Sequence, residues 1–206
     1  MATPKPQIRN MFATPVCVHF LPVAPETNAE LRPLIMERAG TPLNGKGWRS
    51  APDFESWGGG AAQTLFRVAR ELADNMTATR AGGRISLDWK IAGVAALRQK
   101  GDHVEMAARP GAYWSGIYFV DDGYAKSDDE NLAGEVELGD PRGALPAMVA
   151  PHLTYRIPGG AAAGMTDTIR PQSGMIILHP AWLPRGERRH DGASHRVTVE
   201  FDLMVP

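Results

Sequence analysis

Glycine and proline restrict this chain to short secondary-structure elements joined by many turns. The 206 residues include 22 glycines and 17 prolines, and both residue types interrupt helices and central strands. A chain interrupted so often favours a β-sandwich or a barrel over a helical bundle. Because 43% of its residues are hydrophobic, it can still bury a substantial core. We therefore expect one globular domain, residues 1–206, built mainly from short strands.

Helices are expected only in the first part of the chain. One helix is predicted over 25–38, and Gly40 ends it. The clearest helix is predicted over 60–79, where apolar residues recur on one face. Alternating or continuous apolar residues then predict strands over 85–91, 117–120, 175–178 and 197–203. The expected organisation is an N-terminal strand with covering helices, 1–83, followed by a β core, 84–206.

The last predicted strand has one apolar and one polar face. Its polar residues, at every second position, are Arg196, Thr198, Glu200 and Asp202. Side chains two apart in a strand share a face. This face is either solvated or lines the inside of a cup, and the pattern alone leaves both open.

Charge and cysteine content exclude several classes of function. Lys and Arg total 22 against 23 Asp and Glu, so no overall positive field favours a nucleic-acid or membrane partner. Cys17 is the single cysteine, which excludes an internal disulfide framework and a zinc site of several thiolates. No apolar run is long enough for a transmembrane helix. We expect a cytoplasmic protein.

A motif in the middle of the chain resembles that of a known family. Residues 109–120, RPGAYWSGIYFV, resemble the H-x-H-P-G-A-x-x-S-G-V-Y-Y-V motif of a bacterial family of 2-oxoglutarate/Fe(II) oxygenases. The resemblance continues through 47–50, Trp57, 134–143, 174–183 and 196–201. It implies a mainly β fold with helices (α+β), namely a double-stranded β-helix of the jelly-roll or cupin-like type with the N-terminal helices packed on its larger sheet. A homodimer is compatible with it.

The resemblance also implies where a metal and 2-oxoglutarate would bind. Members of such families hold Fe(II) with two histidines, or a histidine and a carboxylate, on one strand and with a distal histidine. A basic residue on the last strand holds the far carboxylate of 2-oxoglutarate. Arg196 and Thr198 match that Arg-x-Ser/Thr pattern, and a guanidinium group suits a carboxylate.

The three implied iron ligands are absent from their expected positions. Aligning the motif places Ala107, Arg109 and Arg185 there. Alanine offers no lone pair, and arginine is a cation without an acceptor. We therefore expect no metal and no cofactor. The alternative is an active dioxygenase that uses Fe(II) and 2-oxoglutarate through relocated ligands, for which the candidates are His103, Glu105, His179 and His190. Whether the protein is an enzyme stays open.

Arginines at these positions predict a different ligand. If Arg109, Arg185 and Arg196 converge on one cup, they attract a small carboxylate or phosphate, and we group Thr198 and Tyr118 with them as ligand-binding candidates. The competing interpretation is an ion-pair network, in which the arginines are neutralised by acidic residues, with candidates Glu105, Glu137, Glu187 and Glu200. The first hypothesis is thus an oxygenase-like protein that binds a small anion.

Overall fold

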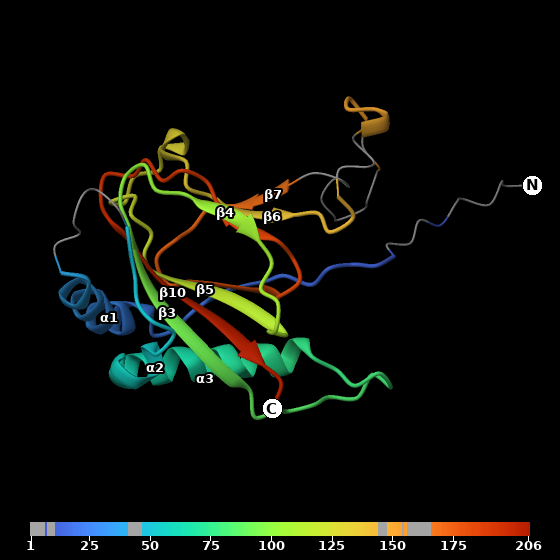
Figure 1. Ribbon diagram of the computed structural model, residues 1–206, viewed down its shortest axis with the longest axis horizontal. Helices are drawn as coiled ribbons and strands as arrows, with labels where there is room; N and C mark the ends of the chain where they lie inside the picture. The colour runs from blue at the N-terminus through green and yellow to red at the C-terminus, as the bar shows by residue number, and fades with distance from the viewer. Residues whose placement is uncertain (1–6, 8–10, 41–46, 144–147, 154, 156–165) are drawn as a thin grey trace, which may run out of the picture.

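Two antiparallel sheets face each other, and helices cover the outer side of the larger sheet (Figure 1). The computed structural model describes residues 7, 11–40, 47–143, 148–153, 155 and 166–206. Within these residues every pair of neighbouring strands is antiparallel. This is the predicted mainly β arrangement, in which helices pack on one sheet and leave the space between the sheets for other side chains.

The larger sheet has the strand order β1-β8-β5-β10-β3-β2. Its strands are β1 (Cys17–Phe20), β2 (Trp48–Arg49), β3 (Lys90–Arg98), β5 (Trp114–Asp121), β8 (Met175–Pro180) and β10 (Arg196–Met204). The smaller sheet has the order β4-β9-β6-β7. Its strands are β4 (Val104–Ala107), β6 (Val136–Gly139), β7 (Thr166–Ile169) and β9 (Arg185–Glu187). A short 3-10 helix, η2 (Glu130–Leu132), precedes β6.

The helices bury their apolar faces against the larger sheet. They are α1 (Ala24–Ala39), α2 (Phe54–Trp57) and α3 (Gly59–Met76). The predicted face of α3 is confirmed, because Leu65 and Ala69 are fully buried in the core between helices and sheet. Helix α1 continues through Pro33. Among the described residues, no helix is long and apolar enough to span a membrane.

The strand predicted over 85–91 is wrong for most of its length. Residues 85–89 form no strand, and β3 begins at Lys90. The carboxylate of Asp74 on α3 binds this segment instead, by accepting hydrogen bonds from Leu87 N at 3.1 Å and Trp89 Nε1 at 2.8 Å. The alternating burial of residues 85–89 therefore does not come from strand pairing. Asp74 on α3 accepts hydrogen bonds in place of a neighbouring strand.

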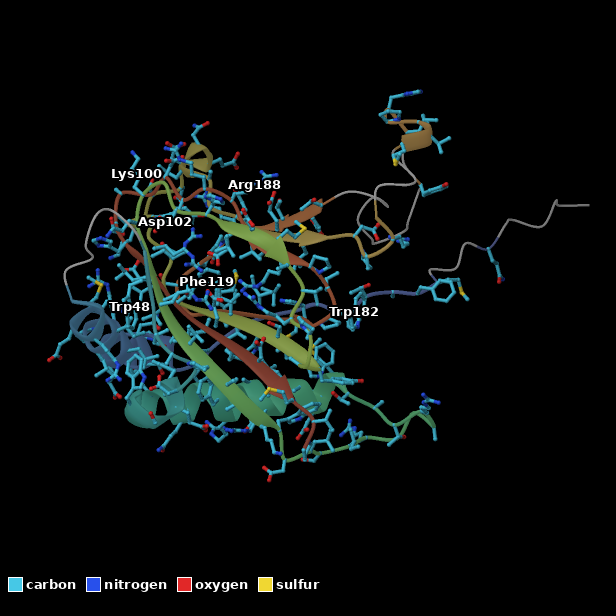
Figure 2. All side chains as sticks on the ribbon, in the orientation of Figure 1. Trp48, Lys100, Asp102, Phe119, Trp182 and Arg188 are labelled. Atoms are coloured by element: carbon cyan, nitrogen blue, oxygen red, sulfur yellow. The ribbon has the colours of Figure 1, made fainter. Side chains whose placement is uncertain are left out.

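The two faces of β10 resolve the alternatives for the last strand. Its apolar residues, Val197, Val199, Phe201 and Leu203, lie in the core on the helix side. Arg196, Thr198 and Glu200 point to the other side and are also buried. We call the space between the two sheets the cup, and the polar face of β10 lines it. Figure 2 shows Phe119 of β5 in this space, where an apolar cluster fills part of it.

Candidate functional site

A buried carboxylate, Glu200, organises the charged part of the cup. Arg49 of β2 donates to both carboxylate oxygens at 2.9 Å, and Arg98 of β3 donates at 2.7 Å. Arg185 of β9 donates at 3.3 Å, and Arg109 lies 3.6 Å away. Burial raises the pKa of Glu200, but Arg185, Arg98 and Arg49 outweigh it and hold the pKa at about 2. Glu200 is therefore ionised throughout the physiological range.

A second buried carboxylate, Glu187, extends the network across the cup. Its oxygens lie 3.6 Å from Arg98, 3.5 Å from Arg185 and 3.4 Å from Arg196. Arg98 and Arg185 thus contact both Glu187 and Glu200, and they join the two sheets through charge. The interpretation of an ion-pair network is confirmed for Glu187 and Glu200. Glu137 instead pairs with exposed Arg188 at 2.7 Å, and Glu105 is exposed on β4.

The network contains more positive than negative charge. Among the described residues, five arginines face these two glutamates, an excess of three positive charges. Arg98, Arg185 and Arg196 are buried with the two glutamates, so the buried part of the network has an excess of one positive charge, which is unfavourable unless an anion or solvent balances it. The cup therefore has an electrostatic preference for an anion.

A cavity of about 100 Å³ lies beside Glu200. Its lining residues are Arg49, Ala92, Val94, Arg109, Ser115, Arg185, Glu200, Phe201 and Asp202. The side chains of Arg49 and Arg109 are 44% and 32% exposed, whereas that of Arg185 is 2% exposed. Arg49 and Arg109 thus stand at the mouth of the cavity, and Arg185 lies at its base.

Arg196 lies in the cup but does not line this cavity. Its guanidinium donates to the carbonyl oxygens of Asp122 at 3.0 Å and Gly134 at 2.6 Å, and it stacks near Phe119 and Tyr124. A Cβ on Gly134 would lie only 2.7 Å from Arg196 Nη2. Arg196 is fully buried, and its Nε and Nη1 are held by protein groups, whereas its Nη2 has no hydrogen-bond partner among the described residues.

The other ligand-binding candidates lie at the cavity, elsewhere in the cup or outside the cup. Arg109 and Arg185 line the cavity. Thr198 lies in the cup, buried, with no hydrogen-bond partner for its hydroxyl among the described residues. Tyr118 was misplaced: it lies on the helix side, where its hydroxyl donates to Asn28 Oδ1 at 2.6 Å and burial raises its pKa. Ser115 and Ile117 of β5 face the cup. Because side chains alternate along a strand, Tyr118 faces the helices.

Arg49, Arg98 and Ser115 were missed as site residues by the sequence analysis. Arg49 reaches Glu200 only because β2 pairs with β3 across Ala96. Arg98 occupies the same face of β3 as Val94 and Ala96, and it lies opposite Arg196 in the sheet. The one signal for these residues in the sequence was the polar residue at every second position of the last strand. It indicated that, if this face were buried, other polar side chains would have to pair with it.

The positions implied for the iron ligands do come together. Ala107 pairs with Arg185 across β4 and β9, and both Arg109 and Arg185 reach Glu200. The residues present do not fit an Fe(II) ion, because the methyl group offers no lone pair and both guanidinium groups are permanent cations.

The relocated ligand candidates are not brought together. His103 and Glu105 are exposed, whereas His179 and His190 are buried. His179 lies opposite Ser115, which pairs with Asp202, whereas the His190 ring packs near Gly123 at the Arg196 end. Asp202 and Arg196, which mark these two ends, are six residues apart along β10, a distance of about 20 Å. In the part of the chain that the structure covers, no three His, Cys, Asp or Glu side chains form a group that could hold a metal.

Residues 95–202 match the family model described as "Putative 2OG-Fe(II) oxygenase". No curated protein gives a significant sequence match. Solved structures share the fold at low identity. A prolyl-4-hydroxylase from Pseudomonas putida is 12% identical with a TM-score of 0.61, and the match covers 94% of each chain. A prolyl hydroxylase from Trichoplax adhaerens, in complex with a hypoxia inducible factor peptide fragment, is 9% identical with a TM-score of 0.62, over 92% of this chain and 83% of that one.

HygX from Streptomyces hygroscopicus, solved with nickel and 2-oxoglutarate, is also similar. It is 14% identical with a TM-score of 0.58, over 93% of this chain and 83% of that chain, and another HygX structure has iron bound. These matches overturn the prediction that no cofactor is to be expected. The matching family and its structural neighbours are Fe(II)- and 2-oxoglutarate-dependent oxygenases, so these are the cofactors that the family implies. The prediction was wrong because it reasoned from three positions alone.

Proposed function

This chain belongs to the 2-oxoglutarate/Fe(II) oxygenase family, and we propose that its cup binds a small anion, a carboxylate or a phosphate, in the cavity beside Glu200. The observation that carries the proposal is that three guanidinium groups, against the two carboxylates of Glu200 and Asp202, line that cavity. Arg109 and Arg185, which the motif alignment assigns to two of the family's ligand positions, both line it, and Arg49 adds a third guanidinium group. Guanidinium groups bind carboxylates and phosphates through parallel hydrogen bonds.

The placement of the arginines supports a ligand that enters from solvent. Arg49 and Arg109 are partly exposed, so they can meet an anion at the mouth while water still surrounds it. Arg185 is buried below them, and its Nε has no hydrogen-bond partner among the described residues. A buried donor without a partner is costly, so an acceptor on a ligand would stabilise the site.

The carboxylates near the cavity reduce the affinity for an anion but do not prevent its binding. Glu200 engages Arg49, Arg98 and Arg185, and in doing so it holds their guanidinium groups in fixed positions. Asp202 adds a carboxylate to the lining. The anion must compete with these two carboxylates, and we expect binding in the micromolar to millimolar range, which corresponds to roughly 4–8 kcal/mol.

The experiment is calorimetric titration of the purified protein with 2-oxoglutarate, succinate and inorganic phosphate, with and without Fe(II). We expect saturable binding of at least one of these anions without Fe(II), weakened by added salt. Thermal unfolding should shift upward, since a ligand at 100 times its Kd stabilises by about 2.7 kcal/mol. Binding that occurs only with Fe(II), or no binding of any of the three, would contradict the proposal.

A pair of matched variants localises the site. Arg109→Gln removes a cation at the mouth, and we expect anion affinity to fall about tenfold. Arg188→Gln is the control, because Arg188 is an exposed arginine directly after β9 that pairs with Glu137 and does not line the cavity. Equal losses in the two variants would mean that the anion binds by general surface charge and not in the cavity.

A further inference from the structure

His179 is a buried side chain that the anion site, as proposed so far, does not use. It is fully buried on β8, and it pairs with Ser115 on β5. Directly opposite residues of antiparallel strands project to the same face of the sheet. Ser115 lines the cavity, whereas His179 does not itself line it and projects to the same side from the neighbouring strand, close enough to feel the charges of the lining residues Arg185 and Arg109.

The hydrogen bond at one ring nitrogen fixes the role of the other. His179 Nδ1 lies 2.9 Å from the carbonyl oxygen of Pro180. A carbonyl oxygen can only accept, so Nδ1 bears the hydrogen and donates. In the neutral ring Nε2 then carries a lone pair and can only accept. Burial, together with the positive charges of Arg185 and Arg109, lowers the pKa of His179 to about 4, so the ring is neutral at physiological pH.

The acceptor Nε2 has nothing to accept from. It is buried and has no hydrogen-bond partner among the described residues. The Nη groups of the nearby arginines are directed to Glu187 and Glu200. Arg185 Nε, which is also without a partner among the described residues, makes no hydrogen bond to His179. Buried polar atoms are nearly always paired, and an unpaired one in a native structure calls for an explanation.

A bare carboxylate would leave this atom unpaired, because carboxylate oxygens are acceptors as well. We propose that the anion of this cavity carries its own O–H donor, which His179 Nε2 accepts while the arginines hold the negative oxygens. The ligand class is therefore a 2-hydroxycarboxylate or a hydrogen phosphate. This inference rests on the proposed function and deepens it, since it names what distinguishes the preferred anion.

Two pairs of probes differ in the donor and little else. Hydrogen phosphate and sulfate are tetrahedral ions of similar size, but at neutral pH only phosphate keeps a proton. Malate and succinate are four-carbon dicarboxylates, and only malate has a hydroxyl group. Calorimetric titration should give about tenfold tighter binding of phosphate than of sulfate, and of malate than of succinate.

Two variants assign that preference to His179. His179→Leu removes the acceptor, and we expect it to bind the members of each pair equally. His179→Gln keeps an acceptor oxygen near the position of Nε2, and we expect it to retain a preference of several fold. Thermal unfolding of both variants shows whether they fold, and the comparison of probes on the wild-type protein needs no variant.

The outcomes separate the two proposals. If the wild-type protein binds phosphate and sulfate equally and malate and succinate equally, the inference about the O–H donor is wrong while the anion site stands. If His179→Leu folds and keeps the preference, His179 is not the acceptor, and the inference is also wrong. If no anion binds at all, the proposed function itself has failed.

Discussion

The two faces of the larger sheet belong to the same strands, but one buries apolar side chains and the other buries charged and polar ones. The helix side of β10 is apolar and packs against α3, as Val199 and Phe201 do. The cup side of the same strand carries Thr198 and Glu200, equally buried, among arginines. Apolar packing is non-directional and tolerates substitution, whereas buried charges require specific partners. The contrast indicates that the helix side is stabilised by apolar packing, whereas the cup side depends on charge pairing.

Removal of the central carboxylate should have the largest effect on this contrast. Glu200→Gln leaves Arg49, Arg98 and Arg185 around a neutral amide, so we expect a loss of about 3–5 kcal/mol in the free energy of unfolding. Denaturation by urea measures it. Glu137→Gln is the control, because its pair with exposed Arg188 is worth about 1 kcal/mol or less. A loss for Glu200→Gln as small as that of the control would mean that the cup does not depend on its charge pairing.

Acid should weaken the cup in two stages. The pKa of His179 is lowered from 6.5 to about 4, first by burial. The unfolded chain therefore binds a proton before the folded protein does, and stability falls as the pH drops from about 6.5 to 4. The pKa of Glu200 is lowered from 4.5 to about 2, so its contribution is present above pH 4.5 and lost on further acidification. Each stage amounts to up to about 3 kcal/mol.

Urea midpoints measured between pH 7 and pH 3 test these stages. The pKa of buried His190 is also lowered by burial, so His179→Gln should reduce the first stage without abolishing it. Stability that is constant between pH 7 and pH 4.5 would contradict the burial of a neutral His179.

Substitutions that remove a hydroxyl group from the cup face of β10, or add one to its helix face, should have the smallest effect on stability. Thr198→Val removes a buried hydroxyl group that has no partner among the described residues, so stability should rise by about 1 kcal/mol or stay equal. Val199→Thr places a hydroxyl group in the apolar core on the other face and should cost about 1–3 kcal/mol. Both changes preserve side-chain shape. Equal losses in the two variants, measured by urea denaturation, would show that the Thr198 hydroxyl is paired after all.

The helix side was predictable from the sequence because apolar periodicity is a local signal. The recurrence of Leu65 and Ala69 placed α3 on the core, and the alternation of β10 marked its two faces. The same signal failed at 85–89, where Asp74 on a helix produced alternating burial without a strand. Periodicity reports which side chains are buried, and it cannot report which backbone partner buries them.

The cup was predictable only in part, because charge partners come from distant strands. The motif alignment placed Arg109 and Arg185 near one another, and Ala107 pairs with Arg185 as that alignment requires. The same alignment assigned Arg196 to the ligand, which stays a prediction: carbonyl oxygens of Asp122 and Gly134 accept from its Nε and Nη1, and its Nη2 has no partner among the described residues. Arg49 lies 151 positions from Glu200 in the chain, and nothing local connects the two.

Arg196 has a consequence for the rate at which a ligand could be exchanged. Because the guanidinium of Arg196 is fully buried, it presents no charge to solvent, whereas the partly exposed Arg49 and Arg109 present theirs at the cavity. Capture of an anion would then be accelerated by the field of these two exposed cations and slowed as ionic strength rises. Ionic strength should therefore change the rate of association more than the rate of dissociation.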